Sequence, residues 1–180
     1  MFDEKQIITQ LADPGKKRAA FTAIVNHYSE PLYWKVRRIV LTHEDANDVL
    51  QNVFLKAWNS LGDFQNKSKF STWLYRIAIN ESLDFIRKQK LNASISADED
   101  LSVANKLMAD ECFDGDETQA LLQEAISRLP DVQRMVFNLR YYDEMKYSEI
   151  SNLLNTSEGA LKASYHLAVK KITEYFKLRD

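Results

Sequence analysis

The chain has 180 residues, 45% of them hydrophobic and 28% charged, which is typical of a folded soluble protein. Four glycines and three prolines are too few for the turns of an all-β fold. The longest apolar run has three residues, far short of the roughly 18 that span a bilayer. The first residues, MFDEKQ, lack the basic start and apolar run of a secretory signal. The single cysteine, Cys112, excludes an intramolecular disulfide, so we expect a cytoplasmic protein.

The net charge of −2 is unevenly distributed along the chain. Residues 1–91 carry fourteen Lys/Arg and ten Asp/Glu, residues 92–119 carry one against eight, and residues 120–180 carry nine against eight. A basic excess on both sides of an acidic centre fits two domains that touch a polyanion, joined by a linker that does not. It fits a solvated loop between nearly neutral flanks equally well. We expect domains at 1–91 and 120–180, with a flexible acidic linker at 92–119.

Apolar residues at three- and four-residue steps predict helices in the first half. One stripe runs from Phe21 to Ile39, and Pro31 inside it predicts a kink or a break. Thr42 is a candidate N-cap of a second helix. Its predicted apolar side contains Ala46, Val49, Leu50, Val53 and Ala57, widened by Phe54, Leu55 and Trp58. A polar loop over 61–69 then precedes a third helix over roughly 70–90, which Ser68 or Ser71 can cap.

The second half predicts four further helical segments. Residues 120–129 form a helix that ends before Pro130. The next helix has an apolar stripe of Val132, Met135, Val136 and Leu139. A short helix over 147–154, a turn over 155–157 and a longer helix with Leu161, Tyr165, Ala168, Ile172 and Phe176 follow. The last two form a helix-turn-helix pattern. No strand pattern competes, so we expect an all-α fold of two small helical domains.

Two clusters carry binding chemistry. Opposite the apolar stripe of the final helix stand Lys162, Ala163, His166 and Lys170. A lysine can donate to guanine O6 and N7, and a small residue can approach a thymine methyl. The second cluster, Phe70, Trp73, Tyr75 and Arg76, can stack on unpaired bases and hold phosphates. The alternatives are a solvated face of a helical hairpin for the first cluster and ordinary core for the second.

Catalytic and metal-binding patterns are missing from the sequence. The three histidines lie far apart, and none of the spacings HExxH, CxxC, GxSxG or GxxxxGK[ST] occurs. We therefore expect no enzyme activity, no cofactor, no metal and no small-molecule substrate.

Two sets of sequence motifs, one in each half of the chain, resemble a known family. The run from Glu44 to Trp58, followed by Phe70 to Asn80 (FSTWLYRIAIN), resembles the second-region domain of bacterial sigma-70 family factors. Three runs in the second half resemble the fourth-region domain of the same family. They are Leu129-Pro130, Tyr147 to Ile150 and Ser157 to Lys162. Because no third-region domain lies between them, the chain resembles the extracytoplasmic-function (ECF) class. The resemblance covers nearly the whole chain.

The resemblance implies an alternative sigma factor that binds RNA polymerase core and directs promoter recognition and DNA opening. The core partners are the clamp helices of the largest subunit and the flap of the second-largest subunit, and an anti-sigma factor is a further partner. The residues implied for the clamp helices are Asp45, Asp48, Gln51 and Asn52. The residues implied to bind the minus-ten element, opened to single strands, are Asn66, Lys67, Ser68, Lys69, Phe70, Trp73, Arg76 and Asn80. The residues implied to bind the duplex minus-thirty-five element are Ser157, Glu158, Gly159, Lys162, Ala163, His166 and Lys170.

The final helix departs from the family pattern at three positions. Ser164, Leu167 and Val169 stand where many members have arginines after the lysine, which implies a weak phosphate grip and an unusual base preference. The main alternative to a sigma factor is a free-standing helix-turn-helix regulator that binds DNA without polymerase. A structural or adaptor α-protein is the second alternative, and it leaves the Lys162 face without a purpose. An enzyme is the third.

Overall fold

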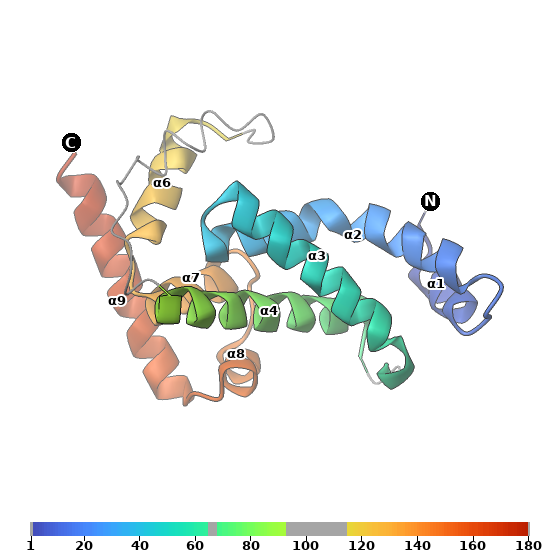
Figure 1. Cartoon of the computed structure of the whole chain (residues 1–180). Helices are drawn as coiled ribbons and strands as arrows, with labels where there is room; N and C mark the ends of the chain where they lie inside the picture. Colours follow the sequence, from blue (N-terminus) through green and yellow to red (C-terminus); the bar gives the residue numbers. More distant parts are fainter. Residues whose placement is uncertain (1, 65–67, 93–114, 180) are drawn as a thin grey trace. The chain divides into compact units, whose positions relative to one another are not determined.

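The computed structural model describes residues 2–64, 68–92 and 115–179, and within these ranges it contains helices and no strand. The chain divides into two compact units, Met1–Ser96 and Ala97–Asp180 (Figure 1). The expected all-α class is confirmed for this part of the chain. The expected linker over 92–119 lies mostly outside the described residues. At its two ends, Asn92 is the last residue of one helix and residues 117–119 belong to the next.

The first unit is built around three long helices. Its elements are α1 (Glu4–Leu11), α2 (Lys17–Val40), α3 (His43–Asn59), the 3-10 helix η1 (Leu61–Asp63) and α4 (Phe70–Asn92). Helices α2, α3 and α4 pack against one another in all three pairings, and α1 lies against α2. Their buried stripes are Ile24, Tyr28, Leu32 and Val36 on α2, Ala46, Val49, Val53 and Ala57 on α3, and Phe70, Leu74, Ala78 and Ser82 on α4. These stripes keep the helical spacing that the sequence predicted, and together they form the core.

Helix α2 continues through Pro31 without a break. Proline has no N–H and so leaves the carbonyl of His27 without its helical donor. Both residues lie on the exposed side of α2, where water can hydrate that carbonyl. The break that the sequence allowed at this position is therefore wrong.

The turn between α2 and α3 forms as the sequence predicted. Leu41 ends α2 in the left-handed region, at φ 74°, and its N–H donates to the carbonyl oxygen of Arg37 over 3.0 Å. The Thr42 hydroxyl then accepts a hydrogen bond from the N–H of Asp45 over 3.1 Å. The carboxylates of Glu44 and Asp45 complement the dipole in the first turn of α3. The predicted N-cap is confirmed.

Helix α1, which the sequence pattern did not predict, is joined to the rest of the unit by Glu4. One oxygen of its carboxylate, Oε1, accepts a hydrogen bond from the backbone N–H of Phe70 over 3.1 Å. The other, Oε2, accepts one from the hydroxyl of Tyr28 over 2.7 Å. Burial, together with the neighbouring Glu4, raises the pKa of Tyr28 above its ordinary value, so the hydroxyl stays a donor. Glu4 therefore satisfies a free N–H at the start of α4 and ties α1 to both α2 and α4.

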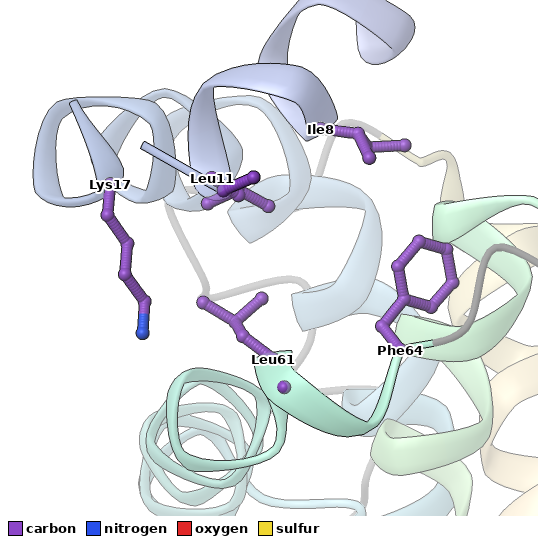
Figure 2. A pocket seen from close by; sticks show the side chains of 7 residues that line it. Ile8, Leu11, Lys17, Leu61 and Phe64 are labelled. Atoms are coloured by element: carbon purple, nitrogen blue, oxygen red, sulfur yellow. The ribbon is translucent and has the colours of Figure 1, made fainter. Parts of the chain in front are cut away.

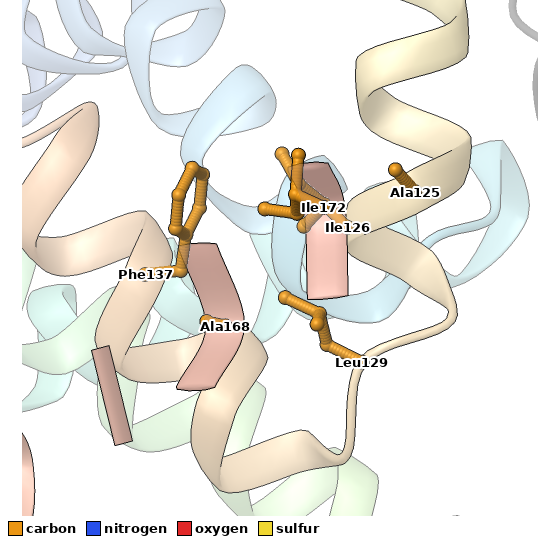
Figure 3. Close-up of a cluster of buried hydrophobic side chains, with 6 residues drawn as sticks. All are labelled: Ala125, Ile126, Leu129, Phe137, Ala168 and Ile172. Atoms are coloured by element: carbon orange, nitrogen blue, oxygen red, sulfur yellow. The ribbon is translucent and has the colours of Figure 1, made fainter. Parts of the chain in front are cut away.

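The second unit packs three helices around the long last one. Its described helices are α6 (Glu117–Ser127), α7 (Asp131–Tyr141), α8 (Tyr147–Leu154) and α9 (Glu158–Lys177). Helix α9 contacts each of the other three. Figure 3 shows a cluster in its core, to which α9 contributes Ala168 and Ile172. The other members are Ala125, Ile126, Leu129 and Phe137.

At the start of α7 the structure corrects the predicted apolar stripe. Val132 is 60% exposed, while the charged Arg134 is 7% exposed. The guanidinium of Arg134 donates to the carbonyl oxygens of Ser127 and Leu129 and also pairs with Asp131 over 3.0 Å. Arg134 is buried because it satisfies carbonyls at the end of α6, which apolar periodicity alone does not reveal.

A second buried charge, Glu124 on α6, joins α6 to the end of α9. The Glu124 side chain is 3% exposed. Its Oε1 accepts hydrogen bonds from the Tyr175 hydroxyl over 2.7 Å, from Arg128 over 3.0 Å and from Arg179 over 3.2 Å. A buried carboxylate is tolerated only when it is paired and hydrogen-bonded, and these three donors meet that requirement.

Glu4→Ala should lower the free energy of unfolding of the first unit by about 2 kcal/mol, because it leaves the Phe70 N–H and the Tyr28 hydroxyl without their charged acceptor. Trp34, Trp58 and Trp73 all lie in this unit, so tryptophan fluorescence during urea unfolding reports on it alone. Glu30→Ala, on the exposed side of α2, is the control. Equal midpoints for the two variants would contradict the role of Glu4.

Glu124→Gln should destabilise the second unit by a similar amount, about 2 kcal/mol, because the charged acceptor shared by three donors is lost. Far-UV circular dichroism should show an earlier loss of part of the helical signal, while the tryptophan transition of the first unit stays unchanged. The control is Glu174→Gln on α9, whose side chain is 58% exposed. If Glu124→Gln unfolded like this control, the buried carboxylate would not hold α6 to α9.

Candidate functional site

The helix-turn-helix lies in the second unit, at the residues that the sequence predicted. Helix α8 ends at Leu154. The next residue, Asn155, adopts the left-handed backbone conformation at φ 51°, which asparagine tolerates better than most residues. The Ser157 hydroxyl caps α9 by accepting a hydrogen bond from the N–H of Ala160 over 3.3 Å. A three-residue turn therefore separates a short helix from a longer one, and the predicted motif is confirmed.

Helix α9 turns its predicted binding residues toward solvent. Leu161 and Ala168 are fully buried and Ile172 is 8% exposed, which fixes the inner face of the helix. The predicted residues are all exposed: Ser157, Glu158, Gly159, Lys162, Ala163, His166 and Lys170. The structure thus brings them together on one surface at the start and middle of α9.

Two cations share the ring of Tyr147 at the start of α8. The guanidinium carbon of Arg140 lies 5.4 Å from the ring centroid and the ammonium of Lys162 lies 5.7 Å from it. Arg140 also donates to the carbonyl oxygen of Met145 over 3.2 Å. The negative face of an aromatic ring attracts a nearby cation. The Lys162 side chain is therefore positioned beside α8, and Lys162 remains exposed to solvent.

In the first unit, the residues predicted to bind unpaired bases are only partly brought together. Ser68, Lys69, Arg76 and Asn80 are exposed, and Trp73 is half-buried. Phe70 is 1% exposed and packs against Trp73 with ring centroids 5.2 Å apart. Its ring has no free face for a base, so Phe70 belongs to the core and not to a contact surface. Asn66 and Lys67 lie outside the described residues.

Phe64, which the sequence reasoning did not select, adjoins the same surface. Its ring lies 5.3 Å from Trp73 and 5.3 Å from Phe70, measured between centroids. Phe64 also lines a hollow of about 280 Å³, which Figure 2 shows from close by. The hollow is lined by Ile8, Leu11, Ala12, Lys17, Leu61, Gly62 and Phe64. The polar loop gave no signal for this hollow, because α1 forms one of its walls and contacts the loop only in the folded unit.

Helix α3 presents a third surface. Asp48, Gln51 and Asn52 are exposed, and Asp45, in the first turn of the helix, is half-buried. Leu55 is 56% exposed and lies one turn beyond Gln51 and Asn52, on the same face. The interpretation of Leu55 as part of the buried side is therefore wrong. An exposed leucine beside acids and amides makes this face suited to a protein partner rather than to phosphate groups.

Within the described ranges, no three His, Cys, Asp or Glu side chains lie close enough together to hold a metal ion. In the same ranges no helix combines the length and the apolar character needed to cross a bilayer. Cys112 lies outside the described residues.

Two family models match the chain. Sigma-70 region 2 matches residues 24–91, which include most of α2 and all but the last residue of α4, and Sigma-70, region 4 matches residues 119–172. Both surfaces of the first unit fall in or beside the first match, and the helix-turn-helix falls in the second.

Two relatives match this chain along most of their length. The ECF RNA polymerase sigma factor SigW of Bacillus subtilis (strain 168) is 35% identical over 170 residues, covering 89% of this chain and 90% of the relative. The ECF RNA polymerase sigma-E factor of Escherichia coli (strain K12) is 28% identical over 172 residues, covering 88% and 86%.

Two solved structures share the fold. CnrH in complex with the cytosolic domain of CnrY has a TM-score of 0.67 at 21% identity, covering 98% of this chain and 99% of that one. The sigma factor RpoE from Bartonella quintana, in complex with the anti-sigma factor NepR, has a TM-score of 0.70 at 19% identity, covering 89% and 98%. With both regions in order and a relative of 35% identity along nearly its whole length, this chain belongs to the ECF class of sigma-70 family RNA polymerase sigma factors.

Proposed function

We propose that this chain acts in the cytoplasm as an alternative sigma factor, which joins core RNA polymerase and directs promoter recognition, DNA opening and the start of transcription. The observation that carries the proposal is that each family match falls within one helical unit that turns a polar helix face to solvent. The chain catalyses no reaction in this proposal. It supplies contacts to protein and DNA, and the polymerase makes the RNA.

The α3 face is the proposed contact with the clamp helices of the largest polymerase subunit. It consists of Asp45, Asp48, Gln51, Asn52 and Leu55. Acids and amides would repel or only weakly hold DNA phosphates, whereas an apolar side chain within a polar rim is typical of a protein interface. Leu55 adds an apolar anchor to the polar residues.

The loop before α4 and the exposed side of α4 are the proposed contact with the opened minus-ten element. The residues are Asn66, Lys67, Ser68, Lys69, Trp73, Arg76 and Asn80, with Phe70 left out because it is buried. Aromatic stacking with neighbouring cations is a common way to hold unpaired bases. The Phe64 ring packs against the Trp73 ring in this arrangement.

The α9 face is the proposed reader of the duplex minus-thirty-five element, through Ser157, Glu158, Gly159, Lys162, Ala163, His166 and Lys170. The second helix of a helix-turn-helix enters the major groove with its first turns nearest the bases. We also propose the flap of the second-largest polymerase subunit and an anti-sigma factor as partners. We propose the anti-sigma factor because of the family and because RpoE, which has a similar fold, was solved in complex with an anti-sigma factor.

Gln51→Ala and Leu55→Ala should each weaken binding to core polymerase about fivefold or more, because truncating an interface anchor commonly costs over 1 kcal/mol. Asp48→Arg should have a larger effect, since it reverses a charge on the same face. Titration of fluorescently labelled full-length chain with core polymerase gives the dissociation constants.

The matched control for the α3 variants is Gln6→Ala, at an exposed position on α1. Far-UV circular dichroism checks that every variant keeps its helical content. Dissociation constants for Gln51→Ala and Leu55→Ala equal to that of Gln6→Ala would remove α3 from the core interface.

The two DNA contacts should respond differently to premelting. Lys162→Ala should reduce initiation at promoters that depend on the upstream element about 5- to 150-fold, because a good base contact is worth ~1 to 3 kcal/mol. A premelted minus-ten element should not fully restore initiation, because the lost contact is to duplex DNA. Asn80→Ala should slow opening, and premelting should restore most of it. A fluorescent base in the minus-ten element measures opening.

Lys177→Ala in the last turn of α9 and Asn26→Ala on α2 are matched controls at exposed positions. Rescue of Lys162→Ala but not of Asn80→Ala by premelting would reverse the assignment of the two units. Tight sequence-specific binding of the chain to duplex DNA without polymerase would instead favour a free-standing regulator.

A further inference from the structure

The exposed side of α9 carries two stripes of different chemistry. Ala160, Ala163 and Leu167 follow one another at three- and four-residue steps and are all exposed, Leu167 by 44%. Lys162, His166 and Lys170 form the second stripe at four-residue steps, beside the first. The outward side of this helix is therefore apolar along one edge and basic along the other.

Packing within the unit does not require the apolar stripe. The inner face of α9 is held by Leu161, Ala168 and Ile172, and Figure 3 shows the last two turned toward the core cluster that includes Phe137. Leu167 is adjacent to Ala168 in sequence and projects from another side of the helix, with nearly half of its surface in water. Removing apolar surface from water is favourable, so a partner that covers the Leu167 side chain would stabilise its complex with this helix.

The surroundings of the stripe favour duplex DNA as that partner. Lys162, His166 and Lys170 lie along one edge, and Lys171 is also exposed on the same helix. Glu174 pairs with Lys170 at 3.9 Å one turn further on, and Glu158 precedes the stripe in the first turn. Gly159 and Ala163 have minimal side chains, and a Cβ added at Gly159 would meet no atom within 4 Å. Small residues flanked by cations let the helix approach the bases while phosphates are held at the side.

Thymine is the base that an apolar stripe can recognise in the major groove. Its C5-methyl is the one apolar group that the four bases present there, and it distinguishes thymine from cytosine. Alanine and leucine side chains can cover such a methyl, and neither can donate or accept a hydrogen bond. We propose that Leu167, next to Ala163, reads a thymine methyl group in the upstream promoter element. This rests on the proposed function of α9 and adds a specificity-determining residue to it.

The test uses core polymerase with the full-length chain and the removal of single methyl groups from DNA. An upstream element is first selected from duplexes randomised at that element, and each selected thymine is then replaced by deoxyuridine, which lacks only the C5-methyl. Loss of the methyl covered by Leu167 should weaken promoter binding about fourfold, from about 0.8 kcal/mol per buried carbon. Leu167→Ala should remove this difference between thymine and deoxyuridine at that position.

Leu178→Ala is the matched control, because Leu178 is 88% exposed and follows the end of α9. It should keep the wild-type response to deoxyuridine at every position. Thermal unfolding should show that Leu167→Ala remains folded.

The proposal would be overturned by a selected element without thymine, by equal binding of thymine and deoxyuridine at every position, or by Leu167→Ala keeping the wild-type difference. In each of these cases the element is still selected and Lys162→Ala still weakens binding, so the reading function of α9 survives. Failure to select any upstream element, together with wild-type binding by Lys162→Ala, would instead overturn both the reading function and this inference.

Discussion

Burial of one stripe on each of the helices α3, α4 and α9 is the constraint on which the binding surfaces proposed for this protein depend. In α9, Leu161, Ala168 and Ile172 occupy the core, so Lys162 and His166 must face outward. In α3, burial of Ala46, Val49 and Val53 similarly turns Gln51 and Asn52 to solvent. Each of these helices therefore has one structural face, and its opposite face is left exposed to solvent.

Buried or half-buried carboxylates then fix how the shorter elements dock. Glu4 connects α1 to the start of α4 and to Tyr28, and Glu124 connects α6 to the end of α9. In each case the carboxylate satisfies donors from segments far apart in sequence. Such contacts hold elements whose own apolar stripes are short, as in the eight-residue α1, which buries no residue fully.

A sigma factor with a net charge of −2 and a pI near 6.0 has little electrostatic attraction of its own for DNA. Binding to phosphates depends on the number of cations that meet the backbone, and core polymerase can supply most of them. The proposed division of labour follows from this. In the proposed function the α3 face attaches the chain to the polymerase, while the α4 and α9 faces contribute base recognition rather than general affinity.

The sequence by itself determined the helices α2, α3, α8 and α9, the Thr42 cap and the outward face of α9, because these depend on local periodicity and on hydrogen bonds between near neighbours. Only the tertiary structure decided that Leu55 and Val132 are exposed, that Phe70 is core and that Arg134 is buried. It also decided that α1 packs beside the loop at Phe64. A neighbouring helix covers only part of an apolar stripe. Packing between distant segments therefore determines which residues at the edges of the stripe are buried in the core and which remain exposed for binding.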